Sequence, residues 1–137
     1  MKKNLFLLIG IVIVFATFMV GCSVSEGRNE KIKDLDFTVM GVDDIPEEFK
    51  TYIENEKMGV FKRTFTDNEY LYIGVGYGEQ STGGYSITVN ELYVTANAIY
   101  IDTNLIGPSI EDQKREVVSY PYVVVKLEYL DKTVVFD

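Results

Sequence analysis

The stretch YLYIGVGY, Tyr70–Tyr77, decides the fold class because its aliphatic residues recur at every second position. Leu71, Ile73 and Val75 fall on one side of an extended chain. Strict alternation is the period of a β-strand, in which successive side chains point to opposite faces of the sheet. The stretch therefore predicts a strand, and the backbone groups of a strand require neighbouring strands to pair with.

Similar runs recur on both sides of this stretch, separated by turn signals. We expect strands at Leu35–Met40, Val60–Phe65, Tyr85–Asn90 with a continuation over Leu92–Thr95 after a bend, Ala98–Asp102, Val117–Leu130 and Val134–Phe136. A loop is expected over Leu105–Glu116, which contains Gly107-Pro108. Short strands in succession predict a mainly β fold, either a small antiparallel β-sandwich or a barrel-like domain.

One N-terminal helix is expected, over Asp44–Lys57. Pro46 suits the first helical position, where the missing N–H does no harm, and Gly59 follows the end of the helix. Four apolar residues form one stripe at helical spacing: Ile45, Phe49, Tyr52 and Ile53. We interpret this stripe as the face that packs on the sheet, and a helix that binds a partner is the alternative.

The N-terminus resembles a bacterial lipoprotein signal. Lys2 and Lys3 precede the apolar run Leu5–Val20, and the small residue Gly21 precedes Cys22, the only cysteine. In such signals the cysteine thiol receives a diacylglycerol, so Cys22 is the predicted lipidation site, and we expect no cofactor besides this covalent lipid. A transmembrane helix is the alternative, but sixteen residues span about 24 Å, less than the roughly 30 Å of a bilayer core.

The sequence divides into three predicted parts. Residues 1–21 are the lipoprotein signal peptide, residues 22–33 are a polar, flexible tether, and residues 34–137 are a single β-rich domain. We therefore expect a protein attached to the cell membrane by its lipid, on the extracytoplasmic face.

Composition excludes several classes of function. The net charge of −8 disfavours binding to nucleic acid. The chain has no histidine and no second cysteine, which excludes Ser-His-Asp and Cys-His catalytic arrangements, imidazole metal sites, thiolate zinc clusters and disulfides. The sequence thus predicts no catalytic residues, no metal site and no enzyme activity.

Two short motifs exceed what a sheet requires. The first is Thr82-Gly83-Gly84-Tyr85, in which adjacent glycines permit a positive φ and a close approach of another backbone. The second is Tyr120-Pro121-Tyr122, where the proline must lie on an edge, at a bulge or at the start of a strand because it has no N–H. Loops that enter strands gather at the ends of a small sandwich, so we expect both motifs to lie close together and Tyr85 or Tyr122 to contact a partner. The alternative is that the glycines only turn the chain and that both tyrosines belong to the core.

In this order and spacing the two motifs resemble the PrcB C-terminal domain family, over roughly residues 69–137. Gly78-Glu79 precedes the first motif, and Val123-Val124-Val125-Lys126 follows the second, as the family pattern has them. The resemblance implies a lipoprotein subunit of a surface protease complex, without peptidase activity of its own. The chain departs from the family in the middle, where only Gly107-Pro108 stands in place of a proline-rich crossover.

These observations predict a membrane-tethered protein that acts as a non-catalytic interaction subunit, with an extracytoplasmic protease as the expected partner. A protease inhibitor is the alternative, because the first motif is also similar to the NPTTGY loop of chagasin-like inhibitors. Against that alternative, Glu79-Gln80-Ser81 precedes Thr82 where those inhibitors have Asn-Pro.

Overall fold

Strand β4 (Tyr70–Tyr77) lies inside a sheet and is covered on both faces. Its side chains Leu71, Ile73 and Val75 face the second sheet of a sandwich, whereas Tyr72 faces a helix. The predicted alternation is confirmed, and the tyrosine face of the strand is buried as well.

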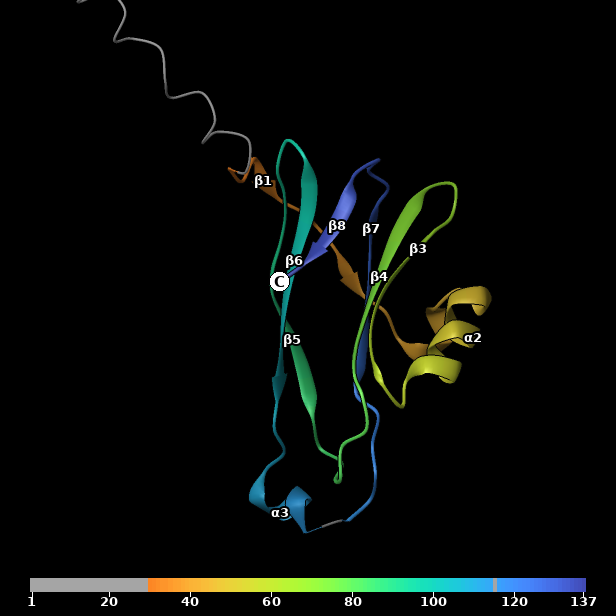
Figure 1. The fold of residues 1–137 in the computed structure, drawn as a ribbon, viewed down its shortest axis with the longest axis vertical. Helices are drawn as coiled ribbons and strands as arrows, with labels where there is room; N and C mark the ends of the chain where they lie inside the picture. Colours follow the sequence, from red (N-terminus) through yellow and green to blue (C-terminus); the bar gives the residue numbers. More distant parts are fainter. Residues whose placement is uncertain (1–29, 115) are drawn as a thin grey trace, which may run out of the picture. The chain divides into compact units, whose positions relative to one another are not determined.

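The computed structural model describes residues 30–114 and 116–137. Two four-stranded sheets form a sandwich (Figure 1): sheet A has the order β1-β5-β6-β8 and sheet B the order β2-β7-β4-β3. The strands are β1 (Lys33–Asp34), β2 (Thr38–Val39), β3 (Val60–Thr66), β4, β5 (Ser86–Val94), β6 (Ala98–Ile106), β7 (Tyr122–Glu128) and β8 (Thr133–Phe136). The fold is mainly β with antiparallel-rich sheets, which confirms the predicted class. One pair, β6 and β8, is parallel, which the sequence analysis did not anticipate.

The main core lies between the two sheets and is aliphatic. Its most deeply buried members are Ile73, Ile99, Ile101 and Val125. Each such side chain stabilises the fold by about 1.5–3 kcal/mol relative to exposure. The core draws on four strands, β4 to β7, so it fixes the two sheets face to face.

Helix α2 (Glu47–Glu56) covers the outer face of sheet B (Figure 1). The helix residues Phe49 and Ile53 are buried against the sheet, which confirms the predicted apolar stripe. Sheet B makes room for aromatic rings through glycines of β4: a Cβ at Gly74 would lie 2.7 Å from Phe49 Cζ, and one at Gly76 would overlap the ring of Phe61. The two glycines in YLYIGVGY therefore leave space for the rings of Phe49 and Phe61 between the sheet and the helix.

The helix start differs from the prediction. Pro46 is the N-cap, with extended φ and ψ of −54° and 138°, and the helix begins at Glu47. A separate 3-10 turn, η3 (Val42–Asp44), precedes it. The prediction that Pro46 is the first helical residue was therefore wrong by one position.

Of the predicted first strand, Leu35–Met40, only Thr38–Val39 is a strand (β2), and a second short strand, β1, lies just before the predicted range at Lys33–Asp34. β1 pairs with β5 in sheet A, and β2 pairs with β7 in sheet B, so the N-terminal segment touches both sheets. Ile32 N also donates to the Val94 carbonyl at 2.8 Å, which places the last residues of the predicted tether on sheet A.

Two further boundaries differ from the expected ones. The predicted loop over Leu105–Glu116 was wrong in part, because Leu105 and Ile106 pair with β5 and a short helix, α3 (Ile110–Gln113), follows. The predicted strand Val117–Leu130 was too long, because regular pairing begins only at Tyr122. The expected bend in β5 is a register shift between Val89 and Glu91.

The predicted signal peptide (residues 1–21) and lipidation site Cys22 lie outside the described residues. Within residues 30–114 and 116–137, no helix has the length and apolar character needed to cross a membrane.

Candidate functional site

One end of the sandwich gathers both sequence motifs. Residues 78–85 leave β4 there, and residues 108–114 and 116–122 lead back into β7; we call these stretches the YPY end (Figure 1). Tyr77 N donates to the Pro121 carbonyl at 3.0 Å. Since Pro121 has no N–H to return, the regular ladder begins one residue later, at Tyr122. Pro121 thus lies at the start of a strand, one of the three positions expected.

Hydrogen bonds join the two motifs directly. Gln80 and Ser119 exchange backbone bonds, Gln80 N to the Ser119 carbonyl at 2.8 Å and Ser119 N to the Gln80 carbonyl at 3.0 Å. Ser119 Oγ also donates to the Thr82 carbonyl at 2.6 Å. The motifs that the sequence places about thirty-five residues apart therefore lie side by side, the arrangement on which the predicted shared surface depends.

The glycines of this end have different roles. Gly84 has a φ of 83°, and a Cβ there would lie 2.8 Å from Asp112 Cβ and 2.9 Å from Pro108 Cβ. Gly83 has no heavy atom within 4 Å of its Cβ position and no positive φ. Gly84 is thus required by the conformation and by the close approach of the α3 segment, whereas Gly83 faces open space.

Helix α3 closes one side of the YPY end. Ser109 caps it, because Asp112 N donates to Ser109 Oγ at 3.3 Å and Ser109 Oγ donates to Asp112 Oδ2 at 2.9 Å. The segment of this short helix approaches the glycine loop so closely at Gly84 that no Cβ fits between Gly84 and Asp112 or Pro108. The end is therefore a braced assembly of three chain segments.

Apolar side chains are exposed on this braced end. Ile110 is 77% exposed, Val117 is 65% exposed, and Val118 is also exposed. Exposed carboxylates stand near them in sequence, at Glu111 and Glu116. Large apolar residues that gather on loops with polar neighbours are typical of protein interaction surfaces.

The three tyrosines of the motifs are all half-buried. Tyr122 packs against the cluster under α2, its ring centroid 6.3 Å from that of Phe61. Burial raises the pKa of the Tyr122 hydroxyl, and the carboxylate of Glu54 adds to this effect. The ring of Tyr120 lies 5.7 Å from Lys57 Nζ. Tyr122 therefore packs on the cluster under α2 with part of its surface in solvent, whereas Tyr120 lies beside Lys57.

One polar atom of the YPY end has no partner. Thr82 Oγ1 is buried and makes no hydrogen bond among the described residues. Its backbone carbonyl is already engaged by Ser119 Oγ. A buried hydroxyl without a partner is unfavourable, so Thr82 contributes to the site through its backbone rather than its side chain.

Sequence reasoning missed three contributors to this end. Ser119 directly precedes Tyr120 and received no predicted role, although it makes the bonds that join the two segments. Val117 and Val118 fall in the predicted strand Val117–Leu130, but they precede β7 and are exposed. The nearby Pro121 was the available signal, since a proline without an N–H interrupts the ladder at that point.

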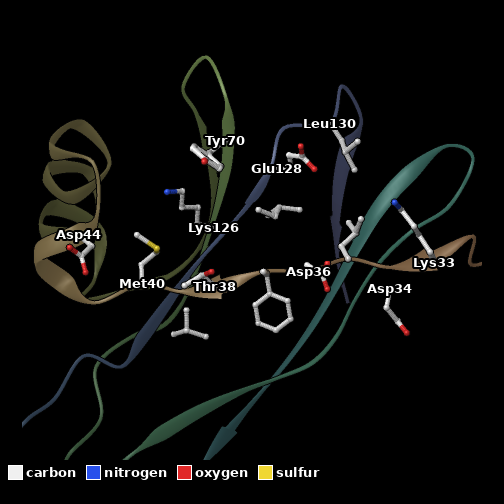
Figure 2. A pocket seen from close by; sticks show the side chains of 14 residues that line it. Lys33, Asp34, Asp36, Thr38, Met40, Asp44, Tyr70, Lys126, Glu128 and Leu130 are labelled. Carbon is white, nitrogen blue, oxygen red and sulfur yellow. The ribbon is translucent and has the colours of Figure 1, made fainter.

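A groove outside the YPY end lies along the N-terminal strands β1 and β2 (Figure 2). It has a volume of about 630 Å³, and Lys126 Nζ lies 3.9 Å from the ring centroid of Tyr70 in its wall. Asp36, Asp44 and Glu128 line it as well, so both signs of charge face it. Among the described residues, no group of three or more His, Cys, Asp or Glu side chains is placed to hold a metal ion.

Comparison with known proteins identifies one family. The model of the family described as PrcB C-terminal matches residues 71–128, which run from β4 through β5, β6 and α3 to the end of β7. No curated protein and no solved structure matches the chain. The matched stretch includes both motifs and the whole YPY end, as the resemblance in the sequence implied. The match over residues 71–128 supports the PrcB C-terminal domain family as the family that this chain resembles.

Proposed function

We propose that this protein is a lipid-anchored, extracytoplasmic lipoprotein that acts as a non-catalytic subunit of a protease complex and binds its partner through the YPY end. The match to the PrcB C-terminal family supports a role as a protease-complex subunit. The observation that carries the proposal is the set of exposed apolar side chains on a braced end: Ile110, Val117 and Val118. Loops held on a rigid sandwich commonly carry recognition.

The bracing matters because it lowers the entropy lost on binding. A loop that is free in solution must be ordered by its partner, at a cost of about 0.5–1.5 kcal/mol for each side chain immobilised. Here the loop is already held by the Gln80–Ser119 bridge and by the packing of Gly84 on α3. A larger part of the free energy gained by burying apolar surface then appears as binding free energy.

Affinity capture of the full chain from detergent-solubilised membranes tests the surface. The double variant Val117→Asp/Val118→Asp places two carboxylates on the YPY end, and we expect it to lose the partner with little change in melting temperature, since both side chains are exposed. Val39→Asp/Val42→Asp is the charge-matched control, because Val39 is 58% and Val42 is 52% exposed and both lie outside the matched stretch, on β2 and η3. Equal capture by all three proteins would refute the proposed surface.

The activity of the captured protease separates a subunit from the inhibitor alternative. A supporting subunit leaves the bound protease active on a peptide substrate, whereas an inhibitor abolishes that activity on binding. We expect the captured enzyme to remain active.

The anchor is tested separately through Cys22. We expect labelled palmitate to enter the wild-type protein and not Cys22→Ser, and the variant to leave the membrane fraction or to remain unprocessed. Equal labelling of both proteins would rule out lipidation at this residue.

A further inference from the structure

Strand β3 forms one edge of sheet B and has a free side. It pairs with β4, and no other strand pairs with it within the part of the chain that the structure describes. Asp67 N donates to the Tyr70 carbonyl at 3.1 Å just beyond the end of β3, in the same register as the strand pair. Since alternate residues of an antiparallel pair point their backbone groups at the partner, Phe65 and every second residue before it bond to β4. The N–H and C=O groups of the others point outward: Val60, Lys62, Thr64 and Thr66.

A groove runs beside this edge, on the side of β8. It has a volume of about 490 Å³ and is lined by Lys62 and Thr64 from β3 and by Val134 and Phe136 from β8. Sheets A and B share the N-terminal segment on one side of the sandwich, through β1 and β2, whereas β3 and β8 form the other two sheet edges. An added strand along β3 would therefore meet outward backbone groups next to a mainly polar groove that also contains Val134 and Phe136.

The charge of the edge is opposite to that of the protein. Lys62 and Arg63 stand side by side on β3 in a chain of net charge −8. The ion pairs formed within residues 30–114 and 116–137 are Lys31–Asp34 and Lys57–Glu54, so neither cation of β3 is matched by a carboxylate there. Asp131 is the only acidic residue among the described residues that line the groove.

Aromatic rings hold both cations in place. Lys62 Nζ lies 5.9 Å from the ring centroid of Phe136, on the groove side, and Arg63 Cζ lies 5.0 Å from that of Tyr52, on the helix side. The two positive charges therefore flank the free edge on its two faces. The ammonium of Lys132, which also lines the groove, is occupied, because its Nζ donates to the carbonyls of Thr95 and Ala96.

We propose that the free edge of β3 binds an extended segment of a partner protein, rich in aspartate and glutamate, as an added β-strand. Main-chain hydrogen bonds would supply affinity, and the cations at Lys62 and Arg63 would select acidic side chains. A second copy of this chain is disfavoured as occupant, because two β3 edges would bring like charges together. The inference rests on the proposed interaction role, and the edge lies outside the family match over residues 71–128.

A labelled peptide tests this edge without knowledge of the natural partner. The probe is a fluorescein-labelled peptide of about eight residues, a strand's length, in which glutamate alternates with valine; its control carries lysine in place of glutamate. With the full-length chain in detergent micelles, we expect anisotropy to report binding of the acidic probe alone. Binding should weaken as salt is added, since exposed charges are screened.

Three variants assign the binding to β3. Lys62→Glu/Arg63→Glu should weaken binding at least about tenfold, whereas the charge-matched control Lys33→Glu/Lys50→Glu should not. Thr64→Pro removes an outward N–H without breaking a bond to β4, and it should also abolish binding. Val117→Asp/Val118→Asp should bind the probe like the wild type, which separates this edge from the YPY end.

Two results would contradict the proposal that β3 binds an acidic strand. Failure of the acidic probe to bind, or equal binding of the lysine control, overturns the proposal while leaving capture through the YPY end unaffected. A second contradicting result combines two observations: the wild type binds no probe, and Lys62→Glu/Arg63→Glu self-associates in sedimentation. The two cations would then protect the exposed edge from pairing with a second copy, and the proposal would be wrong. Melting temperatures of all variants confirm that each is folded.

Discussion

Ser119 Oγ donates a hydrogen bond of 2.6 Å to the carbonyl of Thr82, across 37 positions of the sequence. This bond connects the segment before β7 to the glycine loop after β4. It lies next to the backbone bridge between Gln80 and Ser119, so two neighbouring contacts define how the YPY end is held together.

Removal of this side chain should loosen the YPY end. We expect Ser119→Ala to lower the free energy of unfolding by about 0.5–1.5 kcal/mol, the usual net value of one hydrogen bond. The amides of Gln80 and Ser119 should exchange faster with solvent deuterium. Thr88→Ala is the control, because Thr88 Oγ1 makes only an exposed bond of 3.4 Å to the Asn104 carbonyl. Equal effects of the two substitutions would argue against a bracing role for Ser119.

Adjacent glycines should respond differently to alanine. Gly84→Ala forces a side chain into a positive φ and against Asp112 and Pro108, so we expect a loss of stability of about 1 kcal/mol or more and displacement of α3. Gly83→Ala meets no atom within 4 Å and should leave the melting temperature nearly unchanged. Thermal denaturation of both variants checks this, and similar losses would show that the loop is not held as the structure has it.

Substitution of Tyr122 and Tyr85 should show which of the two tyrosines stabilises the core and which contacts the partner. Tyr122 packs against Phe61, so Tyr122→Ala should lower stability strongly, by less than the roughly 3–5 kcal/mol of a fully buried aromatic because Tyr122 is half-buried. Tyr122→Phe should retain most of that stability. Tyr85 stacks on none of the described rings, and Tyr85→Ala should have the smaller effect on melting and the larger effect on capture of the partner. A larger melting loss for Tyr85→Ala would return Tyr85 to the core.

The sequence predicts the local part of this fold well and the long-range part less so. The alternation in β4 and the apolar stripe of α2 are properties of neighbouring residues, and both appear as expected. The parallel pairing of β6 with β8 is not a local property, because the chain crosses from sheet B to sheet A after β7 and arrives beside β6. No pattern within Thr133–Phe136 specifies which strand it joins.

The candidate site shows the same division. The motif residues mark places where the backbone is special, and the φ of Gly84 and the position of Pro121 follow from residue chemistry alone. The bracing by Ser119 depends on long-range contacts with Gln80 and Thr82, which form only when the sandwich assembles. From the sequence alone, two adjacent valines such as Val117 and Val118 are expected to be buried, because nothing local indicates that they are exposed.

At the opposite end of the sandwich, the turn after β3 carries a titrating group. The Oδ1 atom of Asp67 accepts hydrogen bonds from Glu69 N at 2.9 Å and Tyr70 N at 2.7 Å, and its Oδ2 accepts one from the Tyr72 hydroxyl at 3.3 Å. The two backbone N–H groups are the main reason that the pKa of Asp67 lies below its ordinary value of 3.8 in the folded state. Because these bonds favour the charged form, the unfolded chain takes up the proton at a higher pH than the folded one.

The sign of the pH dependence follows from this lowered pKa. The stability that Asp67 contributes is fully present above the unfolded pKa and is lost as the pH falls through the folded pKa. Asp67→Asn keeps an acceptor oxygen but does not titrate, so it isolates the charge. We expect the free energy of unfolding of the wild type, measured in urea, to exceed that of Asp67→Asn near neutral pH, and the difference to shrink below about pH 4. Comparison with the variant cancels the titration of the other carboxylates. A difference that stays constant from neutral pH to pH 2 would show that the carboxylate charge of Asp67 does not stabilise the turn.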